Sequence, residues 1–324
     1  MTARVSMLLA LLVGSACSDP ASAQLLPDAM AGAPADATLG TGGDAMPFLI
    51  DASLQTPSCT APQLAAGEHD YTLSVGGRMR TYHVHVPPNL AATSRAPLLL
   101  NLHPLTLNGI GQAFFTNMNP AADQRGVIVA YPDGVSGSWN AGTCCGMAAQ
   151  MMLDDVGFMR AMISDIASKA CLDRKRVYAT GMSNGAFLAQ RLGCEASDVI
   201  AAIAPAAGVI GIPLASCHPG RAVPVLEFHG TADTLVDYSA VAPTIATWKD
   251  RDGCTDSPHE IYRQGAVHCE AMDQCAQGAR VILCTADGGG HCWPGATTCP
   301  VGTPIKDIAG NFYILDFLLS HTLP

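Results

Sequence analysis

The chain has 324 residues with 17 basic and 27 acidic side chains, and its net charge of −10 argues against a nucleic-acid-binding protein. The first 54 residues hold one Arg and five Asp, which leaves 16 basic and 22 acidic residues for the rest. That remainder is long enough for one large α/β domain with a sizeable core.

The first 23 residues have the pattern of a secretory signal peptide. Arg4 precedes the apolar run SMLLALLVGSAC, which is too short to span a bilayer as a stable helix and ends in small residues. Two processing sites are open, because GSAC resembles a lipobox ending at Cys17 and ASA precedes Gln24. We therefore expect an extracellular protein, either freely secreted or attached to the cell surface by a lipid on Cys17. That lipid is the one membrane contact we expect.

Residues 24–55 are rich in Ala, Gly, Pro and Asp and show little periodicity. Such a segment cannot bury enough apolar surface to fold, so we expect a disordered tether. The catalytic domain is then expected over residues 56–324, with no appended binding module.

Cysteine usage points to disulfides. Twelve of the 13 cysteines lie between Cys59 and Cys299, an even number in a protein expected to be exported. The pairing stays open, but Cys144 and Cys145 are not expected to pair with each other, because a disulfide normally joins Cα atoms about 4.4 to 6.8 Å apart. We expect them to hold two separate loops instead. Two His-Cys dipeptides would suit zinc, yet no CxxC pair is present, so we predict neither a metal nor another cofactor.

The expected folded part alternates short apolar runs with longer amphipathic ones, a pattern typical of a mostly parallel sheet flanked by helices. The run at 96–104 is continuously apolar, as expected for a strand buried on both faces. Asp154 or Asp155 can cap a helix whose apolar positions recur at helical spacing. Strands are predicted within residues 80–87, 96–104, 126–134, 175–181, 199–208, 223–230 and 279–287, and helices within 153–172, 186–196 and 305–324.

The sequence GMSNG, residues 181–185, lies between a predicted strand and a predicted helix. A GxSxG motif in this setting indicates a nucleophile elbow, in which small neighbours allow a strained turn that exposes the serine hydroxyl. Ser183 is therefore the candidate nucleophile. The alternative is an ordinary helix start in which Ser183 acts as the cap.

A serine nucleophile needs a base, and the base needs an acidic partner, in the chain order Ser, acid, His. Asp233 follows the strand predicted at 223–230 and is the preferred acid, while Asp237 is the second candidate. His291 lies in the sequence GGGHCWPG after the last predicted strand and is the candidate base. A disulfide through Cys292 would hold the His291 imidazole in place.

The oxyanion of an ester intermediate needs backbone N–H donors. Asn184, which follows the nucleophile, is the first candidate, and Leu105, after the strand at 96–104, is the second. Pro104 has no N–H, while Thr106 is a candidate side-chain contact to substrate.

Seven motifs in order along residues 71–323 resemble a secreted esterase family that includes feruloyl esterases and polyhydroxybutyrate depolymerases and is related to family 1 carbohydrate esterases. The motifs are RTYHVHVP, SWNAGTCCG, DDVGFMRAMISDI, RVYATGMSNGAF, IAAIAPAAG, PVLEFHGTAD and GGGHCWPG. The resemblance implies an α/β-hydrolase fold with Ser183, Asp233 and His291 as its catalytic triad. Two departures stand out: His-Pro replaces the family's usual His-Gly after the early strand, and Val-Asp-Tyr replaces Val-Pro-Tyr after the acid.

The substrate is expected to be an ester of a plant cell-wall polysaccharide, which makes a feruloyl esterase the preferred interpretation. Trp139 and Asn140 lie in a loop that could border the site, Trp293 lies close to His291, and an aromatic wall would suit a phenolic acyl group. The alternatives are core packing for Trp139 and bracing of the His291 loop for Trp293. The alternative functions are a polyester depolymerase and a non-catalytic secreted binding protein on a hydrolase scaffold.

Overall fold

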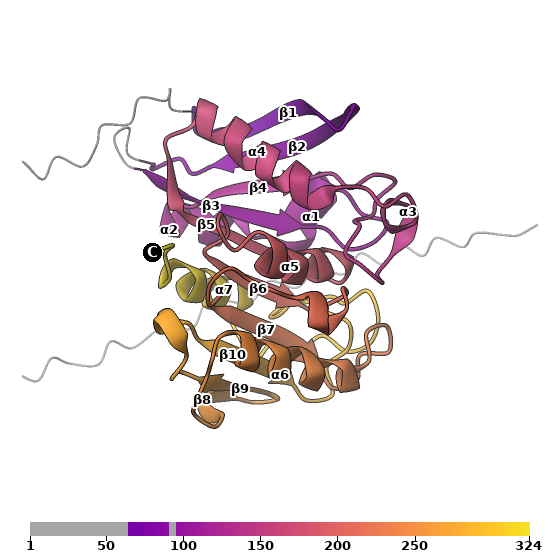
Figure 1. Cartoon of the computed structure of the whole chain (residues 1–324), viewed down its shortest axis with the longest axis vertical. Coiled ribbons are helices and arrows are strands. Elements are labelled where there is room, and N and C mark those ends of the chain that lie inside the picture. The colour runs from indigo at the N-terminus through magenta and orange to yellow at the C-terminus, as the bar shows by residue number, and fades with distance from the viewer. Residues whose placement is uncertain (1–63, 91–94) are drawn as a thin grey trace, which may run out of the picture. The chain divides into compact units, whose positions relative to one another are not determined.

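In the computed structural model, which describes residues 64–90 and 95–324, one ten-stranded sheet organises the domain (Figure 1). The strand order is β1-β2-β4-β3-β5-β6-β7-β10-β9-β8. The six strands from β4 to β10 in this order run parallel, and an antiparallel pair flanks them on each side. The strands are β1 Gly67–Val75, β2 Arg78–Val86, β3 Ala96–Leu102, β4 Ile128–Pro132, β5 Leu172–Met182, β6 Ala202–Ala206, β7 Val225–Gly230, β8 His259–Gln264, β9 Val267–Met272 and β10 Val281–Ala286.

Helices cover both faces of this sheet. Helices α4, α5 and α6 bury apolar side chains against one face, and α2 and α7 pack on the other (Figure 1). The helices are α1 Gly109–Thr116, α2 Asn119–Arg125, α3 Gly146–Gln150, α4 Asp155–Lys169, α5 Asn184–Glu195, α6 Val241–Arg251 and α7 Gly310–Leu319.

The central strands supply both cores because successive side chains of a strand point to opposite faces. In β3, Leu98 and Leu100 belong to the core beneath α4 and α5, while Leu99 belongs to the core beneath α2 and α7. All seven β3 residues are buried, as expected for a strand covered on both faces. The predicted α/β architecture with a mostly parallel sheet is confirmed.

Several elements had no clear sequence signal. The short helices α1, α2 and α3, helix α6 and the β8–β9 hairpin were not predicted. The cap of α4 is now assigned, because Asp154 Oδ1 accepts a hydrogen bond from the Gly157 N–H at 2.7 Å, while Asp155 is buried. The expected signal peptide, the tether and the lipid attachment at Cys17 lie outside the described residues.

Five disulfides join described cysteines, which confirms the prediction of a disulfide-rich domain. They are Cys144–Cys145, Cys194–Cys217, Cys254–Cys275, Cys269–Cys284 and Cys292–Cys299. The expectation that Cys144 and Cys145 hold separate loops was wrong. The two adjacent cysteines pair with each other, with their Cα atoms 3.1 Å apart and a cis peptide bond between them.

Candidate active site

Ser183 occupies the sharp turn between β5 and α5. Its φ of 54° and ψ of −123° place a non-glycine residue in a sparsely populated region, as a nucleophile elbow requires. A Cβ on Gly185 would lie 2.1 Å from the Leu102 carbonyl oxygen, so only glycine lets the helix start pass so close to β3. The Ser183 side chain makes no capping hydrogen bond to the first turn of α5, which argues against the helix-cap alternative.

Asp233 and His291 form a hydrogen-bonded pair. His291 Nδ1 lies 2.7 Å from Asp233 Oδ2, and both side chains are almost completely buried. The other carboxylate oxygen, Oδ1, accepts the backbone N–H groups of Leu235 at 2.8 Å and Val236 at 2.9 Å. Burial alone would raise the pKa of Asp233, but the hydrogen bonds from His291 and the two amides outweigh burial and hold that pKa below its ordinary value. Asp233 is thus held as an anion facing one nitrogen of the imidazole.

Asp237, the second candidate acid, does not reach His291 through any hydrogen bond in the described structure. It is exposed, and its Oδ1 accepts the Ser239 N–H at 2.8 Å at the start of a short 3-10 helix. Hydrogen bonding from the side chain and the backbone of Ser239 lowers the pKa of Asp237. The sequence Val-Asp-Tyr at residues 236–238, where the family usually has Val-Pro-Tyr, therefore does not displace the Asp233 carboxylate from His291.

The sheet brings the three residues to the same edge. Ser183 follows β5, Asp233 follows β7, and His291 follows β10, and these strands run parallel with β6 between β5 and β7. In an α/β sheet the carboxyl ends of parallel strands form the usual edge for a ligand site. The loops after β7 and β10 touch directly, because a Cβ on Gly230 would lie 2.3 Å from the Gly289 carbonyl oxygen.

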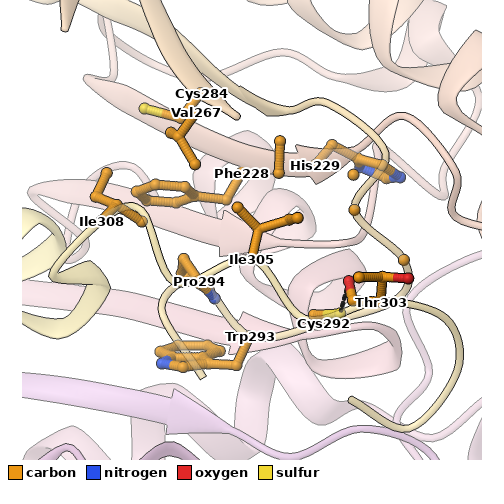
Figure 2. A pocket seen from close by; sticks show the side chains of 14 residues that line it. Phe228, His229, Val267, Cys284, Cys292, Trp293, Pro294, Thr303, Ile305 and Ile308 are labelled. Carbon is orange, nitrogen blue, oxygen red and sulfur yellow. Dashed lines mark hydrogen bonds between the residues drawn. The ribbon is translucent and has the colours of Figure 1, made fainter. Parts of the chain in front are cut away.

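The loop that carries His291 is fixed on both sides. The His291 N–H donates to the Val301 carbonyl at 2.8 Å, and the predicted disulfide through Cys292 is present and joins Cys299. Beneath this loop lies a cavity of about 30 Å³, and Figure 2 shows apolar side chains such as Phe228 and Ile305 around it. That space is too small for an acyl group, so the cavity belongs to the packing of the loop.

Both predicted oxyanion donors are available. Within residues 64–90 and 95–324, the backbone N–H groups of Asn184 and Leu105 have no hydrogen-bond acceptor. Thr106, the predicted side-chain contact, is exposed in the same turn, has a φ of 72° and donates its N–H to the Gly137 carbonyl at 2.7 Å. The turn after β3 thus presents the Leu105 N–H beside an exposed threonine.

His103 is a positioning residue that sequence reasoning missed. Its Nε2 accepts the Gly134 N–H at 2.8 Å, so its Nδ1 carries the proton and donates to the Pro104 carbonyl at 2.8 Å. Burial lowers the pKa of His103, which keeps this ring neutral and in that tautomer. The ring thereby fixes the turn that holds Leu105. The unusual His-Pro dipeptide at residues 103–104 is the sequence signal at this turn.

Trp139 is not an aromatic wall of the site, and this expectation was wrong. Its side chain is completely buried, and its indole Nε1 donates to the His103 carbonyl at 2.9 Å. Its backbone N–H donates to Asn184 Oδ1 at 2.7 Å, and its carbonyl accepts from Asn184 Nδ2 at 3.1 Å. Trp139 therefore joins the turn of Leu105 to Asn184, the first residue of α5, from a buried position.

Asn140 and Trp293 also have structural partners. Asn140 donates its N–H to Asp155 Oδ2 and its side-chain amide to the Leu153 carbonyl, each at 2.7 Å. Trp293 is 2% exposed, and its Nε1 donates to Asn311 Oδ1 at 2.8 Å, so it braces the loop after His291 against α7. Both residues thus have structural roles, and Trp293 also lines a groove beside the loop after His291.

Two features bear on cofactors and membranes. Among the described residues, no group of three or more His, Cys, Asp or Glu side chains is arranged to hold a metal ion. No helix in the described ranges has the length and apolar character needed to cross a bilayer.

Comparison with known sequences gives relatives among esterases. Residues 80–236 match the family described as Esterase PHB depolymerase. The chain is 30% identical to Putative esterase NocK of Nocardia uniformis subsp. tsuyamanensis, with 98% of both chains covered. It is 35% identical over 230 residues to Feruloyl esterase B of Piromyces equi, covering 64% of this chain and 42% of that protein. It is also 32% identical to a bifunctional acetylxylan esterase/xylanase of Neocallimastix patriciarum, covering 72% of this chain. The chain thus spans 42% and 33% of the length of these last two relatives.

Solved structures agree on the fold. An acetyl xylan esterase from Aspergillus awamori superposes with a TM-score of 0.56 at 16% identity, covering 69% of this chain and 94% of that chain. A thermostable esterase superposes with a TM-score of 0.52 at 14% identity, covering 79% and 63%. At such low identity the likeness is one of architecture.

Proposed function

The chain belongs to the Esterase PHB depolymerase family, and from this membership we propose that it is a serine carboxylic-ester hydrolase acting on feruloylated plant cell-wall polysaccharide. One observation carries the proposal. A hydrogen-bonded Asp233–His291 pair and a strained, uncapped Ser183 follow parallel strands of the same sheet, together with two unpaired backbone N–H donors. Such a set is the machinery of acyl transfer through a tetrahedral intermediate.

In the proposed mechanism His291 Nε2 takes the proton of the Ser183 hydroxyl while the oxygen attacks the ester carbonyl carbon. The carbonyl oxygen becomes an oxyanion that accepts hydrogen bonds from the Asn184 and Leu105 N–H groups. When the intermediate collapses, the alcohol leaves with the proton from His291. A water molecule then attacks the acyl-enzyme by the same route and releases the carboxylic acid. Asp233 holds the His291 ring in the tautomer that leaves Nε2 free to accept.

The apolar surface near the site supports an acyl group larger than acetyl. Leu105 is 39% exposed, and Met147 is 47% exposed one residue after Gly146, whose Cβ position lies 2.8 Å from Leu105 Cδ1. Leu235, in the loop of Asp233, is 60% exposed. An aromatic acyl group would cover such side chains from water, since apolar contact contributes about 25 cal/mol per Å² of buried area.

A groove of about 700 Å³ supports a sugar chain as the alcohol part of the substrate. It lies between the segment 293–298 after His291, the start of α7 and the α1–α2 region, and none of its lining side chains is charged. Phe114 is 90% exposed at this groove, and Gln124, Asn117 and Thr297 add amides and a hydroxyl. An exposed ring with neutral hydrogen-bonding groups suits the apolar face and the hydroxyls of a neutral polysaccharide.

The deciding experiment compares ferulate release from feruloylated arabinoxylan, acetate release from acetylated xylan and clearing of a polyhydroxybutyrate suspension. We expect ferulate release to have the highest kcat/KM. We expect Ser183→Ala to reduce all ester cleavage by at least about 10⁴-fold. Faster clearing of the polyester would favour the depolymerase alternative, which the family description supports. Absence of hydrolysis on every ester would favour a binding protein on a hydrolase scaffold.

We further propose that the protein acts outside the cell. Five disulfides among the described cysteines would persist in an oxidising compartment and be reduced in a cytosol. The predicted signal sequence over residues 1–23 agrees with this location, and acylation of Cys17 would retain the protein at the cell surface. Mass spectrometry of the mature N-terminus separates the lipid-anchored form from the freely secreted one.

A further inference from the structure

A second imidazole lies against the carboxylate of Asp233. His229 is the penultimate residue of β7, and its Nε2 is 3.5 Å from Asp233 Oδ2, the oxygen that also faces His291 Nδ1 at 2.7 Å. The same Nε2 lies 2.9 Å from the Val236 carbonyl oxygen. Asp233 Oδ2 is therefore in contact with two histidines, of which the mechanism proposed above uses one.

Behind His229 a buried polar chain runs into the core. Its Nδ1 lies 3.3 Å from Glu227 Oε1, and Glu227 Oε2 accepts from Gln190 Nε2 at 2.8 Å. Gln190 Oε1 in turn accepts the indole N–H of Trp248 at 2.6 Å. The side chains of Glu227 and His229 are both 0% exposed, and Gln190 of α5 and Trp248 of α6 are also fully buried, so this polar chain lies in the protein interior.

The partners of His229 determine which protons it carries. The Val236 carbonyl can only accept, so Nε2 carries a proton. Nδ1 faces the Glu227 carboxylate, which favours a proton on Nδ1 as well. With both nitrogens protonated, the ring is an imidazolium. Burial lowers the pKa of His229, but Glu227 and Asp233 outweigh burial and raise it above its ordinary value. Burial raises the pKa of Glu227 to about 7, against the opposing effects of His229, Gln190 and Gly208.

Simple packing does not explain this arrangement. A buried ion pair is costly to desolvate, and apolar residues of similar volume are often equally or more stabilising. Unlike apolar residues, the charged pair places a positive charge 3.5 Å from Asp233. His229 also forms a hydrogen bond to the Val236 carbonyl, in the loop that carries Asp233.

We propose that His229 is a positioning residue for the Asp233–His291 pair: its imidazolium, favoured by the two carboxylates of Glu227 and Asp233, clamps the loop of Asp233 through the Val236 carbonyl and offsets part of the Asp233 charge. The inference rests on the proposed function, because it assumes that His291 acts as the base for Ser183. Its effect is to make the His291 ring easier to deprotonate, so that the base works at lower pH.

The other charged or titratable groups around His229 are few among the described residues. Glu227 comes from its own strand, Asp233 and the more distant Asp237 from the following loop, and the ring of Tyr238 packs against it with centroids 6.0 Å apart. His291 reaches it through the shared Asp233 oxygen. Of these neighbours, Glu227 is the buried carboxylate that faces Nδ1 of His229, while Asp233 faces Nε2 and is shared with His291.

The test is the pH profile of kcat/KM for p-nitrophenyl acetate with the full-length protein. His229→Gln retains an N–H group that can reach the Val236 carbonyl but carries no charge. Glu227→Gln removes the carboxylate that faces Nδ1 of His229. The acid limb is the part of the profile where kcat/KM falls as His291 becomes protonated. We expect each variant to move this limb to higher pH by about 0.5 to 1 unit, because one charge close to Asp233 is lost. At a pH on this limb, that shift appears as a roughly three- to tenfold loss of kcat/KM. Little loss is expected on the alkaline plateau.

Controls separate this effect from structural damage. His321→Gln replaces a half-buried histidine that packs on Phe317, near the amino-terminal half of β5. This variant should have the same acid limb as the unaltered protein. The double variant His229→Gln/Glu227→Gln should shift no further than either single variant, because the two residues act through one charge. Thermal melting reports on folding in every case.

Each outcome decides the inference. An unmoved acid limb in a folded His229→Gln protein overturns it, and so does an equal loss of activity at every pH, which would indicate a structural role. A shift in both single variants without a further shift in the double variant supports it. Failure of the proposed function looks different, since Ser183→Ala would then retain the activity of the unaltered protein.

Discussion

The proposed acid of the site can be tested by Asp233→Asn. Oδ1 of Asp233 accepts two backbone N–H groups, from Leu235 and Val236, and Oδ2 accepts from His291 Nδ1. An asparagine in this place must keep its oxygen on the two amides, because an NH2 group there would face two donors. Its NH2 group therefore points at His291 Nδ1 and can only donate to it.

That donation forces the His291 ring into the tautomer with its proton on Nε2, where it cannot accept the proton of Ser183. In a serine hydrolase the wrong tautomer costs about 10⁴-fold in kcat, or about 5.5 kcal/mol of transition-state stabilisation. Because both loop amides keep their acceptor, we expect the melting temperature to change by no more than a few degrees. The assay is hydrolysis of p-nitrophenyl acetate at pH 7.5, with circular dichroism as the measure of folding.

Asp237→Asn is the matched control, since Asp237 is exposed and accepts only from Ser239. We expect it to keep full activity. If Asp233→Asn stayed active while Asp237→Asn lost its activity, the assignment of the acid would be wrong, and Asp237 would have to reach His291 in a conformation other than the one described here.

Three further changes test other parts of the structure. Asp252 is buried with its Oδ2 unpaired. Burial raises the pKa of Asp252 to about 7, although the Val223 N–H and Arg221 oppose this effect. The folded protein therefore holds a proton that the unfolded chain has lost, so the free energy of unfolding should fall as pH rises from about 4 to 7. Asp252→Asn removes that loss, and chemical denaturation should show it to be about 1 to 3 kcal/mol more stable than the unaltered protein at pH 8, but not at pH 4. The double variant Cys292→Ser/Cys299→Ser opens a short loop, and we expect about 2 kcal/mol lower stability and a lower kcat from a mobile His291, whereas an unchanged kcat would show that backbone bonds suffice. Gly185→Ala would drive a Cβ into the Leu102 carbonyl, and we expect loss of soluble protein or of activity; a fully active variant would contradict the close approach at the elbow.

Much of the site follows from local sequence patterns. A strand, a GxSxG turn and a helix are contiguous, so the elbow of Ser183 could be predicted without tertiary information. Asp233 and His291 each come a few residues after an apolar strand, and parallel strands present their carboxyl ends at one edge. Chain order and strand ends were therefore enough to nominate both residues.

Elements with weak periodicity could not be predicted in this way. Helices α1, α2 and α3 have five to eight residues each, too few for a clear 3.6-residue pattern. Strand β8 is mostly exposed, so its sequence lacks the alternation of a half-buried strand. Their positions depend on packing against the finished sheet.

The sequence by itself determined the class of fold, the serine elbow and the candidate acid and base, because each depends on neighbours in the chain. The tertiary structure decided which carboxylate faces His291, and it placed Trp139 in the core, where it links His103 to Asn184. It also set His229 against Asp233. These contacts join residues from different strands and loops, and burial of a tryptophan or the charge of a histidine depends on what surrounds it in space.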